Sequence, residues 1–347
     1  MVQDRADPDL RALTDWLGRN LPGFSGPVRL DKFNRGQSNP TYRLRAASGD
    51  YVLRRKPPGV LLKSAHAVER EFRVQKALAG SEVPVARMHV LCEDETVIGS
   101  AFYVMAHVAG RSFDDPRLPE TGLDTRVAIY EEMNRVLAAI HGIDLQARGL
   151  ADFGPAGNYY RRQIDRWTRQ YRASETGTIA AMDELISWLD ANVPAEDGRR
   201  TLVHGDYRID NLLFAEDGPA CVAVLDWELS TIGHPFADLA ALIMQWRLPP
   251  GAEGRGLAGI DRAALGLPED QAFIDGYCAR TGLSGIPDFG FYLAFCFFRM
   301  GAILQGVRKR ALDGNASNPE IGLRLASAVP RYAAGGLEAA KQGQGRT

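Results

Sequence analysis

Three polar side chains near the middle of the chain have the types and spacing that proton transfer and metal binding need. Asp206 and Asn211 lie in the run HGDYRIDN (204–211), and Asp226 ends the next apolar run. A carboxylate can accept a proton from a hydroxyl group, and amide and carboxylate oxygens are ligands that suit Mg²⁺. The turn signal Asp217-Gly218 predicts a hairpin, on which these side chains would converge.

The spacing H-x-D-x-x-x-x-N is that of a kinase catalytic loop. Phosphoryl transfer needs metal ions on the phosphates and a carboxylate near the acceptor hydroxyl. The runs LVHGDYRIDNLLF and VAVLDWELSTIGHPFADLA resemble the aminoglycoside phosphotransferase and choline kinase group. They are most similar to the kinase-like domain fused to some acyl-CoA dehydrogenases. The resemblance extends from Arg35 to about Arg310.

This resemblance implies roles for four residues around the hairpin. It implies that Asp206 is the catalytic base and that Asn211 and Asp226 are Mg²⁺ ligands. His204 would be a structural brace of the loop, although it could equally be an ordinary core histidine. Asp238 is expected to cap the following helix and to brace the same loop.

The N-terminal part of the chain contains the expected phosphate-binding residues. The run GQSNPTY (36–42) occupies the place of the phosphate-covering loop, and the resemblance assigns phosphate binding to the Ser38 hydroxyl and nearby N–H groups. Arg54 stands where many kinases have lysine, and its guanidinium can fork onto phosphate oxygens. Arg55 and Lys56 follow directly and stay open as alternatives.

Two further segments complete the expected nucleotide site. Glu71 is expected to orient the cation by an ion pair, with Glu69 as its nearest rival. The run FYVMAHVAG (102–110) resembles a kinase hinge, where backbone groups of Ala106 and Val108 would face the adenine of ATP (or the base of GTP).

The hydrophobic periodicity predicts a small sheet followed by a mainly helical region. Strands are expected at 28–33, 41–45, 51–54, 88–92 and 102–107, with a helix between the third and fourth that has Ser64 as N-cap and Gly80 as stop. Helices are expected around 127–140 and 179–189, and then at 236–246, 268–281, 291–310 and 321–334, with a frayed tail after Lys341. We therefore predict an α+β, two-lobed, protein-kinase-like fold, with an N-terminal nucleotide-binding lobe (1–107) and a C-terminal catalytic and acceptor-binding lobe (108–347).

Bulk composition narrows the class of partner. The 347 residues have a formal net charge of −2. This overall charge gives no reason to expect that the protein binds nucleic acid. The longest apolar run, Phe291–Leu304, is too short to span a membrane and contains Arg299, and the polar N-terminus does not read as a secretory signal. The four cysteines lie far apart, without metal-ligand spacing. We expect a soluble, cytoplasmic protein that acts on a small molecule.

Basic residues suggest the class of acceptor. The stretch 158–172 contains five arginines and one acid, and as a helix it places Arg162, Arg166 and Arg169 on one face; Arg299 belongs to a second basic group. These arginines would repel a polycationic aminoglycoside and attract phosphates. With the resemblance, they favour an anionic, acyl-like acceptor such as a hydroxyacyl-CoA, with Arg162, Arg166 and Arg299 as candidate contacts. The alternative is a solvated helix face.

Three other functions remain as alternatives. One is an aminoglycoside kinase or another small-molecule kinase of the choline or sugar type. Another is a catalytically silent pseudokinase that binds nucleotide, although such a module need not keep all three polar residues. A metal-dependent hydrolase built on His204, Asp206, Asp226 and His234 lacks a compact metal spacing. The sequence indicates neither the nucleotide preference nor the oligomeric state.

Overall fold

A computed structural model describes residues 8–33, 39–57, 66–251, 255–315 and 318–344. These residues form two compact units. The first unit contains the chain up to Ser112 together with Gln146–Leu150 and Asn211–Ser230, and the second unit contains the rest.

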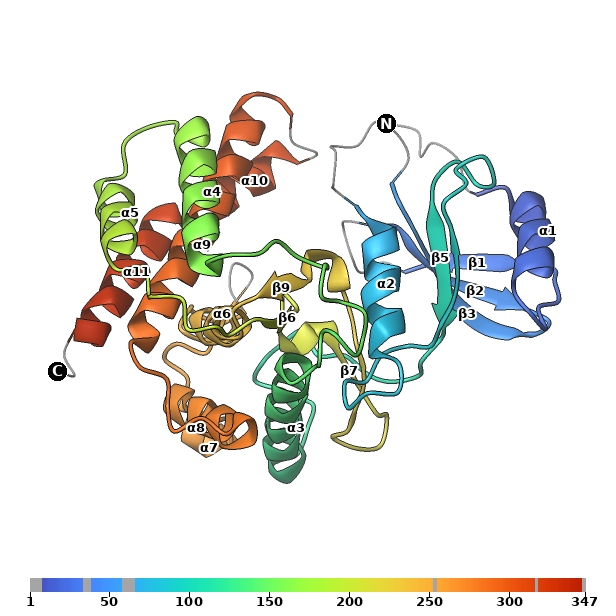
Figure 1. Cartoon of the computed structure of the whole chain (residues 1–347), viewed down its shortest axis with the longest axis horizontal. Coiled ribbons are helices and arrows are strands. Elements are labelled where there is room, and N and C mark those ends of the chain that lie inside the picture. Colours follow the sequence, from blue (N-terminus) through green and yellow to red (C-terminus); the bar gives the residue numbers. More distant parts are fainter. Residues whose placement is uncertain (1–7, 34–38, 58–65, 252–254, 316–317, 345–347) are drawn as a thin grey trace. The chain divides into compact units, whose positions relative to one another are not determined.

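The first unit is built on a five-stranded antiparallel sheet with the order β1-β2-β3-β5-β4 (Figure 1). Its elements are α1 (Leu10–Asn20), β1 (Arg29–Lys32), β2 (Thr41–Ala46), β3 (Gly49–Arg55), α2 (Val68–Leu78), β4 (Met88–Cys92), β5 (Phe102–Ala106), β7 (Leu212–Phe214), β8 (Cys221–Val224) and the 3₁₀ helix η2 (Trp227–Leu229).

The sheet lies between the two helices of this unit, as Figure 1 shows. Successive side chains of a strand point to opposite faces. Phe102 and Val104 of β5 accordingly pack in one core with Leu13 and Leu17 of α1, whereas Tyr103 packs on the other side with α2. The sheet therefore fixes β3, β5 and α2 with respect to one another.

The hairpin β7–β8 also belongs to the first unit. Phe214 exchanges two backbone hydrogen bonds with Arg111 (2.8 and 2.9 Å), and the Val224 N–H donates to the Pro84 carbonyl at 2.8 Å. The two units thus differ from the consecutive lobes 1–107 and 108–347 that the sequence suggested. Such long-range pairing leaves no local signal in the sequence.

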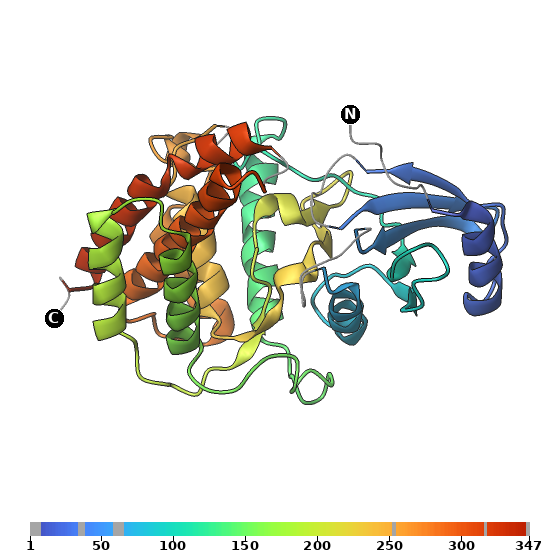
Figure 2. The ribbon, with the colours of Figure 1, turned by 90° about the horizontal axis from the view of Figure 1, so that it is seen from above.

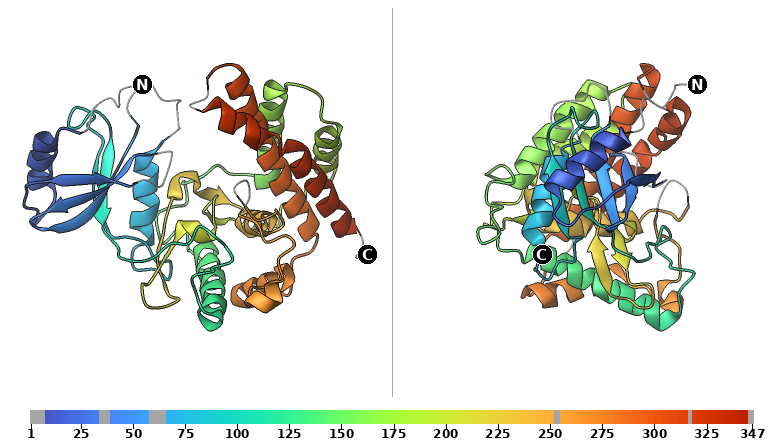
Figure 3. Two further views of the ribbon diagram at one scale, coloured as in Figure 1. Left: turned by 180° about the vertical axis from the view of Figure 1, so that it is seen from behind. Right: turned by 90° about the vertical axis from the view of Figure 1, so that its right-hand side faces the viewer.

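The second unit is mainly helical, and α9 packs against α4, α5, α6, α10 and α11 (Figures 2 and 3). Its elements are α3 (Leu123–His141), α4 (Tyr159–Ser174), α5 (Ala180–Ala191), the paired strands β6 (Thr201–Val203) and β9 (Thr231–Gly233), α6 (Phe236–Trp246), α7 (Arg262–Leu265), α8 (Asp270–Thr281), α9 (Phe289–Leu312), α10 (Pro319–Ala326) and α11 (Val329–Gln344). A short 3₁₀ helix, η1 (Ile209–Asn211), precedes the β7–β8 hairpin in the chain.

Helix α9 is, within the described ranges, the single helix long and apolar enough to cross a membrane. However, 67% of its most apolar window is buried inside the protein, as in the core helix of a globular unit.

The predicted α+β class is confirmed, with a sheet in one unit and helices dominating the other. One helix was missed, and two expectations about single elements were wrong. The helix α1 was not anticipated, although Asp9 caps it by accepting from the N–H groups of Arg11 and Ala12. Helix α2 has Ala67 at its N-cap, and Ser64 lies outside the described residues. The helix expected at 321–334 is divided into α10 and α11, because Pro330 is tolerated only in a first helical turn.

Candidate active site

The loop after β6 presents Asp206 from the second unit. Gly205 has a φ of +87°, which suits glycine, and the Asp206 N–H donates to His204 Nδ1 at 3.3 Å. The Asp206 carboxylate lies 3.2 Å from Arg208 Nε and its side chain is 28% exposed. A partly exposed carboxylate on a fixed loop is an arrangement that suits a proton acceptor.

Asp238 holds this loop through its backbone. Its carboxylate accepts the His204 N–H at 2.6 Å and the Gly205 N–H at 2.8 Å, and it lies 3.3 Å from His141 Nε2. The other ring nitrogen of His141 lies 2.8 Å from the Tyr277 hydroxyl. All of these side chains are buried. These contacts, from His141 through Asp238 to the loop, therefore fix the position of the residues just before Asp206.

The charge of Asp238 is stabilised in this buried site. Burial by itself raises the pKa of Asp238, but the hydrogen bond and positive field of His141, the field of His204 and the Gly205 N–H bring that pKa below its ordinary value. The expectation that Asp238 also caps α6 was wrong. The N-cap is Pro235, whose side chain has no hydrogen-bonding group, and the Asp238 carboxylate accepts from the loop instead.

Asn211 and Asp226 lie at the open end of the β7–β8 hairpin in the first unit. Leu212 pairs with Val224, and the Leu225 N–H donates to the Asn211 carbonyl at 2.8 Å, so that the two residues flank the same end of the ladder. Asp226 has a φ of +63°, a left-handed conformation that costs a non-glycine residue about 1–3 kcal/mol. Such strain is concentrated at functional sites.

Arg54 on β3 contacts three carboxylates of the first unit. Its Nε lies 2.8 Å from Glu71 Oε2, and its Nη2 lies 2.8 Å from Asp226 Oδ1 and 3.4 Å from Glu228 Oε2. Burial alone lowers the pKa of Arg54, but these carboxylates raise it above its ordinary value. For Glu71, burial outweighs the Arg54 charge and raises the pKa. The guanidinium is therefore firmly charged and is held at the end of the hairpin that carries Asp226.

The geometry distinguishes Arg54 from the alternative cations. Arg55 is 3% exposed and donates from Nε to the Ser100 hydroxyl at 2.9 Å. Lys56 lies 3.0 Å from Glu69. Glu69 is therefore the partner of Lys56 rather than of Arg54. The cation paired with Glu71 is Arg54.

A buried hydrogen-bond network holds Glu71. Asn39 Nδ2 donates to Glu71 Oε1 at 2.7 Å, and the Tyr103 hydroxyl donates to Oε2 at 3.0 Å. His66 Nδ1 lies 3.0 Å from the Asn39 amide oxygen. Sequence reasoning missed Asn39 and Tyr103 as supporting residues. A signal existed, since both lie in segments attributed to the nucleotide site, but nothing local indicated their common partner.

Two of the three other predicted residues of the nucleotide site, Ala106 and Val108, lie within the described residues. Ser38 lies outside the described residues. The Ala106 N–H donates to the Arg87 carbonyl at 2.8 Å, so its carbonyl is the group that could face a base. Val108 follows the end of β5.

The donor set at the hairpin suits Mg²⁺. Within the described ranges, no group of three or more His, Cys, Asp or Glu side chains could hold a metal ion. Asn211 and Asp226 instead offer one amide oxygen and one carboxylate, and protein Mg²⁺ sites often combine one or two carboxylates with substrate phosphates. His234, which the hydrolase alternative needed, lies 3.3 Å from Asp197.

The acceptor candidates lie around two aromatic rings of α4 in the second unit. The guanidinium groups of Arg166 and Arg299 lie 5.3 and 5.7 Å from the ring of Trp167. Burial raises the pKa of Tyr159 to about 12, an effect that the fields of Arg299 and Arg162 oppose. In the part of the chain that the structure describes, none of these three arginines forms an ion pair with a carboxylate, whereas Arg161 and Arg172 do.

Comparisons with known proteins agree on a family. The family model of the phosphotransferase enzyme family matches residues 29–277. A crystal structure from Ralstonia eutropha, of a protein named as a candidate aminoglycoside phosphotransferase, is 48% identical, with a TM-score of 0.89 over 97% of this chain and 99% of that one. Aminoglycoside phosphotransferase APH(4)-Ia shares the fold at 18% identity, with a TM-score of 0.63 over 97% of this chain and 99% of that one.

Curated relatives are longer than this chain. Mouse acyl-CoA dehydrogenase family member 10 is 50% identical over 310 residues, which are 88% of this chain and 29% of that protein. Mouse acyl-CoA dehydrogenase family member 11 is 41% identical over 344 residues, which are 96% of this chain and 43% of that protein. The chain therefore spans less than half the length of these relatives. With the kinase-like fold confirmed, the chain belongs to the phosphotransferase enzyme family.

Proposed function

We propose that this protein transfers the γ-phosphoryl group of ATP (or GTP), with Mg²⁺, to a hydroxyl group of a small molecule. The observation that carries the proposal is the contact of one guanidinium, that of Arg54, with both Glu71 and Asp226. It resembles the ion pair that orients phosphates in kinases, joined to a residue suited to bind the metal. A ternary complex of APH(4)-Ia with AMP-PNP and hygromycin B also supports a nucleoside triphosphate as donor.

Each of the predicted site residues would have one role in this reaction. The Ala106 carbonyl and the Val108 N–H would hydrogen-bond the base, while Ser38 and Arg54 would bind phosphate oxygens. Asp206 would accept the proton of the acceptor hydroxyl. Phosphoryl transfer depends mainly on positioning and electrostatics, which fits the buried supports of these groups.

Asn211 and Asp226 would hold Mg²⁺, which when bound neutralises charge on the phosphates. The two side chains flank one hairpin end, and both supply hard oxygen ligands. The convergence of Asp206 with them on one phosphoryl group stays a prediction.

The decisive experiment is an ADP-release assay with a panel of acceptors, run with and without Mg²⁺. We expect acceptor-dependent ADP formation that Mg²⁺ removal abolishes. Binding of ATP without any turnover would instead favour a pseudokinase, and acceptor phosphorylation that persists in Asp206→Asn at the wild-type rate would refute the role of Asp206.

For the acceptor, we propose an anionic, acyl-like compound such as a hydroxyacyl-CoA. The supporting observation is that the guanidinium groups of Arg166 and Arg299 lie over the ring of Trp167. Guanidinium groups can stack on a nucleobase and can pair with phosphates. The relatives named as acyl-CoA dehydrogenases point to the same chemical class. The test compares ADP formed with 3- or 4-hydroxyacyl-CoA and with kanamycin; rapid turnover of kanamycin alone would refute this choice.

A further inference from the structure

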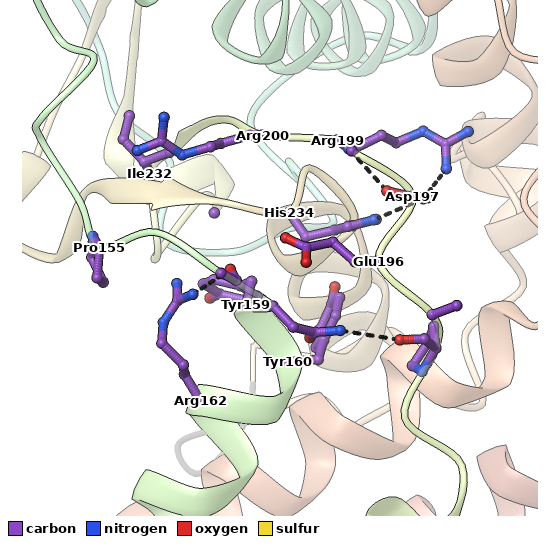
Figure 4. A pocket seen from close by; sticks show the side chains of 16 residues that line it. Pro155, Tyr159, Tyr160, Arg162, Glu196, Asp197, Arg199, Arg200, Ile232 and His234 are labelled. Carbon is purple, nitrogen blue, oxygen red and sulfur yellow. Dashed lines mark hydrogen bonds and ion pairs between the residues drawn. The ribbon is translucent and has the colours of Figure 1, made fainter.

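A pocket of about 90 Å³ lies at the start of α4 in the second unit (Figure 4). Three segments line it: the residues that lead into α4 together with its first turn, the segment 194–200 before β6, and the end of β9 with His234. A single water needs only about 10–15 Å³ of such volume. The pocket therefore has room for a chemical group of several heavy atoms.

Close packing fixes the shape of this pocket. A Cβ atom at Gly154 would lie 2.6 Å from the Ile232 nitrogen, and one at Gly233 would lie 2.7 Å from the ring of Tyr159. The segment before α4 is thus pressed against β9, and only glycine fits at these two positions. Pre-formed pockets of this kind bind ligands without a large ordering cost.

The charges that line the pocket are only partly compensated. Asp197 pairs with Arg199 and lies 3.3 Å from His234 Nε2 (Figure 4). Arg162 donates to the carbonyls of Ala156 and Gly157. Arg200 donates to the carbonyls of Ala151 (3.0 Å) and Gly154 (3.3 Å). Within the described residues neither Arg162 nor Arg200 contacts a carboxylate, so two guanidinium charges remain for a ligand.

Tyr160 adds a buried polar atom at the same place. The residue lines the pocket and is 3% exposed, and its hydroxyl has no hydrogen-bond partner in the part of the chain that the structure describes. Its ring is packed against His234 and Tyr292, with centroid distances of 5.2 Å to each. A buried hydroxyl without a partner is unfavourable, and a ligand oxygen that accepted from it would offset this cost. The N-terminus of α4 also favours an anion here.

We propose that this pocket binds a phosphate monoester that carries a hydroxyl group on the neighbouring carbon. Arg162 and Arg200 bind the phosphate oxygens, and the Tyr160 hydroxyl donates to the same group. Two guanidinium groups match a dianion, whereas a carboxylate would leave one of them uncompensated. Glu196, which lines the pocket without a partner in the described ranges, accepts from the neighbouring hydroxyl.

The inference rests on the proposed acceptor, because the 3′-phosphoribose of coenzyme A has this arrangement of groups. The pocket need not adjoin Asp206, since a long pantetheine arm separates that phosphate from the acyl chain. Arg166 and Arg299 beside Trp167 then remain for the adenine and the diphosphate.

The test is calorimetric binding of coenzyme A and of 3′-dephospho-coenzyme A to the 347-residue chain, without nucleotide or Mg²⁺. We expect the wild-type protein to bind coenzyme A about tenfold or more tightly than the dephospho form, as for a charge-assisted contact of about 1.5–3 kcal/mol. Arg162→Gln and Arg200→Gln should each reduce the ratio of the two affinities, and the double variant should bring this ratio to about one. Tyr160→Phe should lower it less. Arg169→Gln, on an exposed position of the same helix, is the matched control and should keep the ratio.

The outcomes separate this pocket from the proposed reaction. Equal binding of the two compounds by the wild-type protein, or a preference that persists in a folded double variant, would overturn the pocket assignment. A preference that depends on the arginines, in a protein that does not phosphorylate hydroxyacyl-CoA, would uphold the pocket and reject the acceptor. Turnover of both hydroxyacyl-CoA forms with equal KM would reject the pocket alone.

Discussion

The substitution Asp238→Asn tests whether the Asp238 carboxylate holds the catalytic loop in place. The substitution keeps size and shape but replaces one acceptor oxygen by an NH₂ group. That group would face a backbone N–H of His204 or Gly205, which now donates at 2.6 and 2.8 Å. His141, 3.3 Å away, would lose its charged partner.

The cost can be worked out from these contacts. A hydrogen bond to a charged group contributes about 1.5–3 kcal/mol, and an unpaired buried donor costs about 1–3 kcal/mol. Since Asp238 is 1% exposed, water cannot replace the lost partners. We expect a loss of about 3–5 kcal/mol in the free energy of unfolding, the range for breaking a buried charged pair. At about 2–4 °C per kcal/mol, the Tm should fall by about 6–20 °C.

Thermal unfolding followed by circular dichroism at pH 7 measures this change, with Asp165→Asn as control. Asp165 is exposed and lies 4.0 Å from Arg161, so its variant should stay within about 0.5 kcal/mol. If Asp238→Asn unfolded like that control, the carboxylate would not be holding the loop.

The pH dependence provides a second readout. Because the folded-state pKa of Asp238 is lowered, its contribution to stability is fully present above the unfolded-state pKa of about 3.9 and is lost as the pH falls through the folded-state pKa. The Tm difference between wild type and Asp238→Asn should therefore shrink below about pH 4. A difference that grew on acidification would contradict the reasoning.

Three further variants test the proposed roles. Asp206→Asn should keep the fold and nucleotide binding but lower kcat by roughly 10²–10⁴; steady-state kinetics would detect a wild-type rate, which would exclude Asp206 as the base. Asp226→Ala should abolish the Mg²⁺-dependent part of the Tm increase caused by ATP, and an unchanged increase in a melting assay would remove Asp226 from the metal site. Arg54→Lys should raise the KM for ATP about tenfold, because an ammonium cannot reproduce the forked contacts to two carboxylates. Arg55→Lys, at the neighbouring position bonded to Ser100, should not, and equal KM values for both variants would refute the distinction.

Local patterns in the sequence were enough to predict most elements. The strand at Met88–Cys92 and the helix at Phe236–Trp246 have the predicted bounds, because strand and helix periodicity is written in neighbouring residues. The break before Pro330 and the helix α1 were missed, although each has a local cause in proline or in an Asp9 cap. These misses concern the interpretation of short signals rather than information that the sequence lacks.

The supports of the site could not be predicted in the same way. His141 and Asp238 are 97 positions apart in the chain, and His141 and Tyr277 are 136 apart. Each residue alone is an ordinary helix residue, and only folding gives it a partner. A motif identifies the residues that bear the chemistry, whereas the residues that position them depend on contacts that no local pattern contains.

Arg54 illustrates why the support matters for the function. Its Nε faces Glu71, which is 1% exposed and fixed by Asn39 and Tyr103, whereas its Nη2 faces Asp226, whose side chain is 33% exposed. One guanidinium thus has one buried partner and one partly exposed partner. On the proposed roles, Glu71 would keep Arg54 in its orientation if Asp226 bound the metal, and the Nη2 of Arg54 would then be available to a phosphate oxygen. A lysine has one nitrogen and could not hold both positions, which gives a physical reason for arginine at this place in the chain.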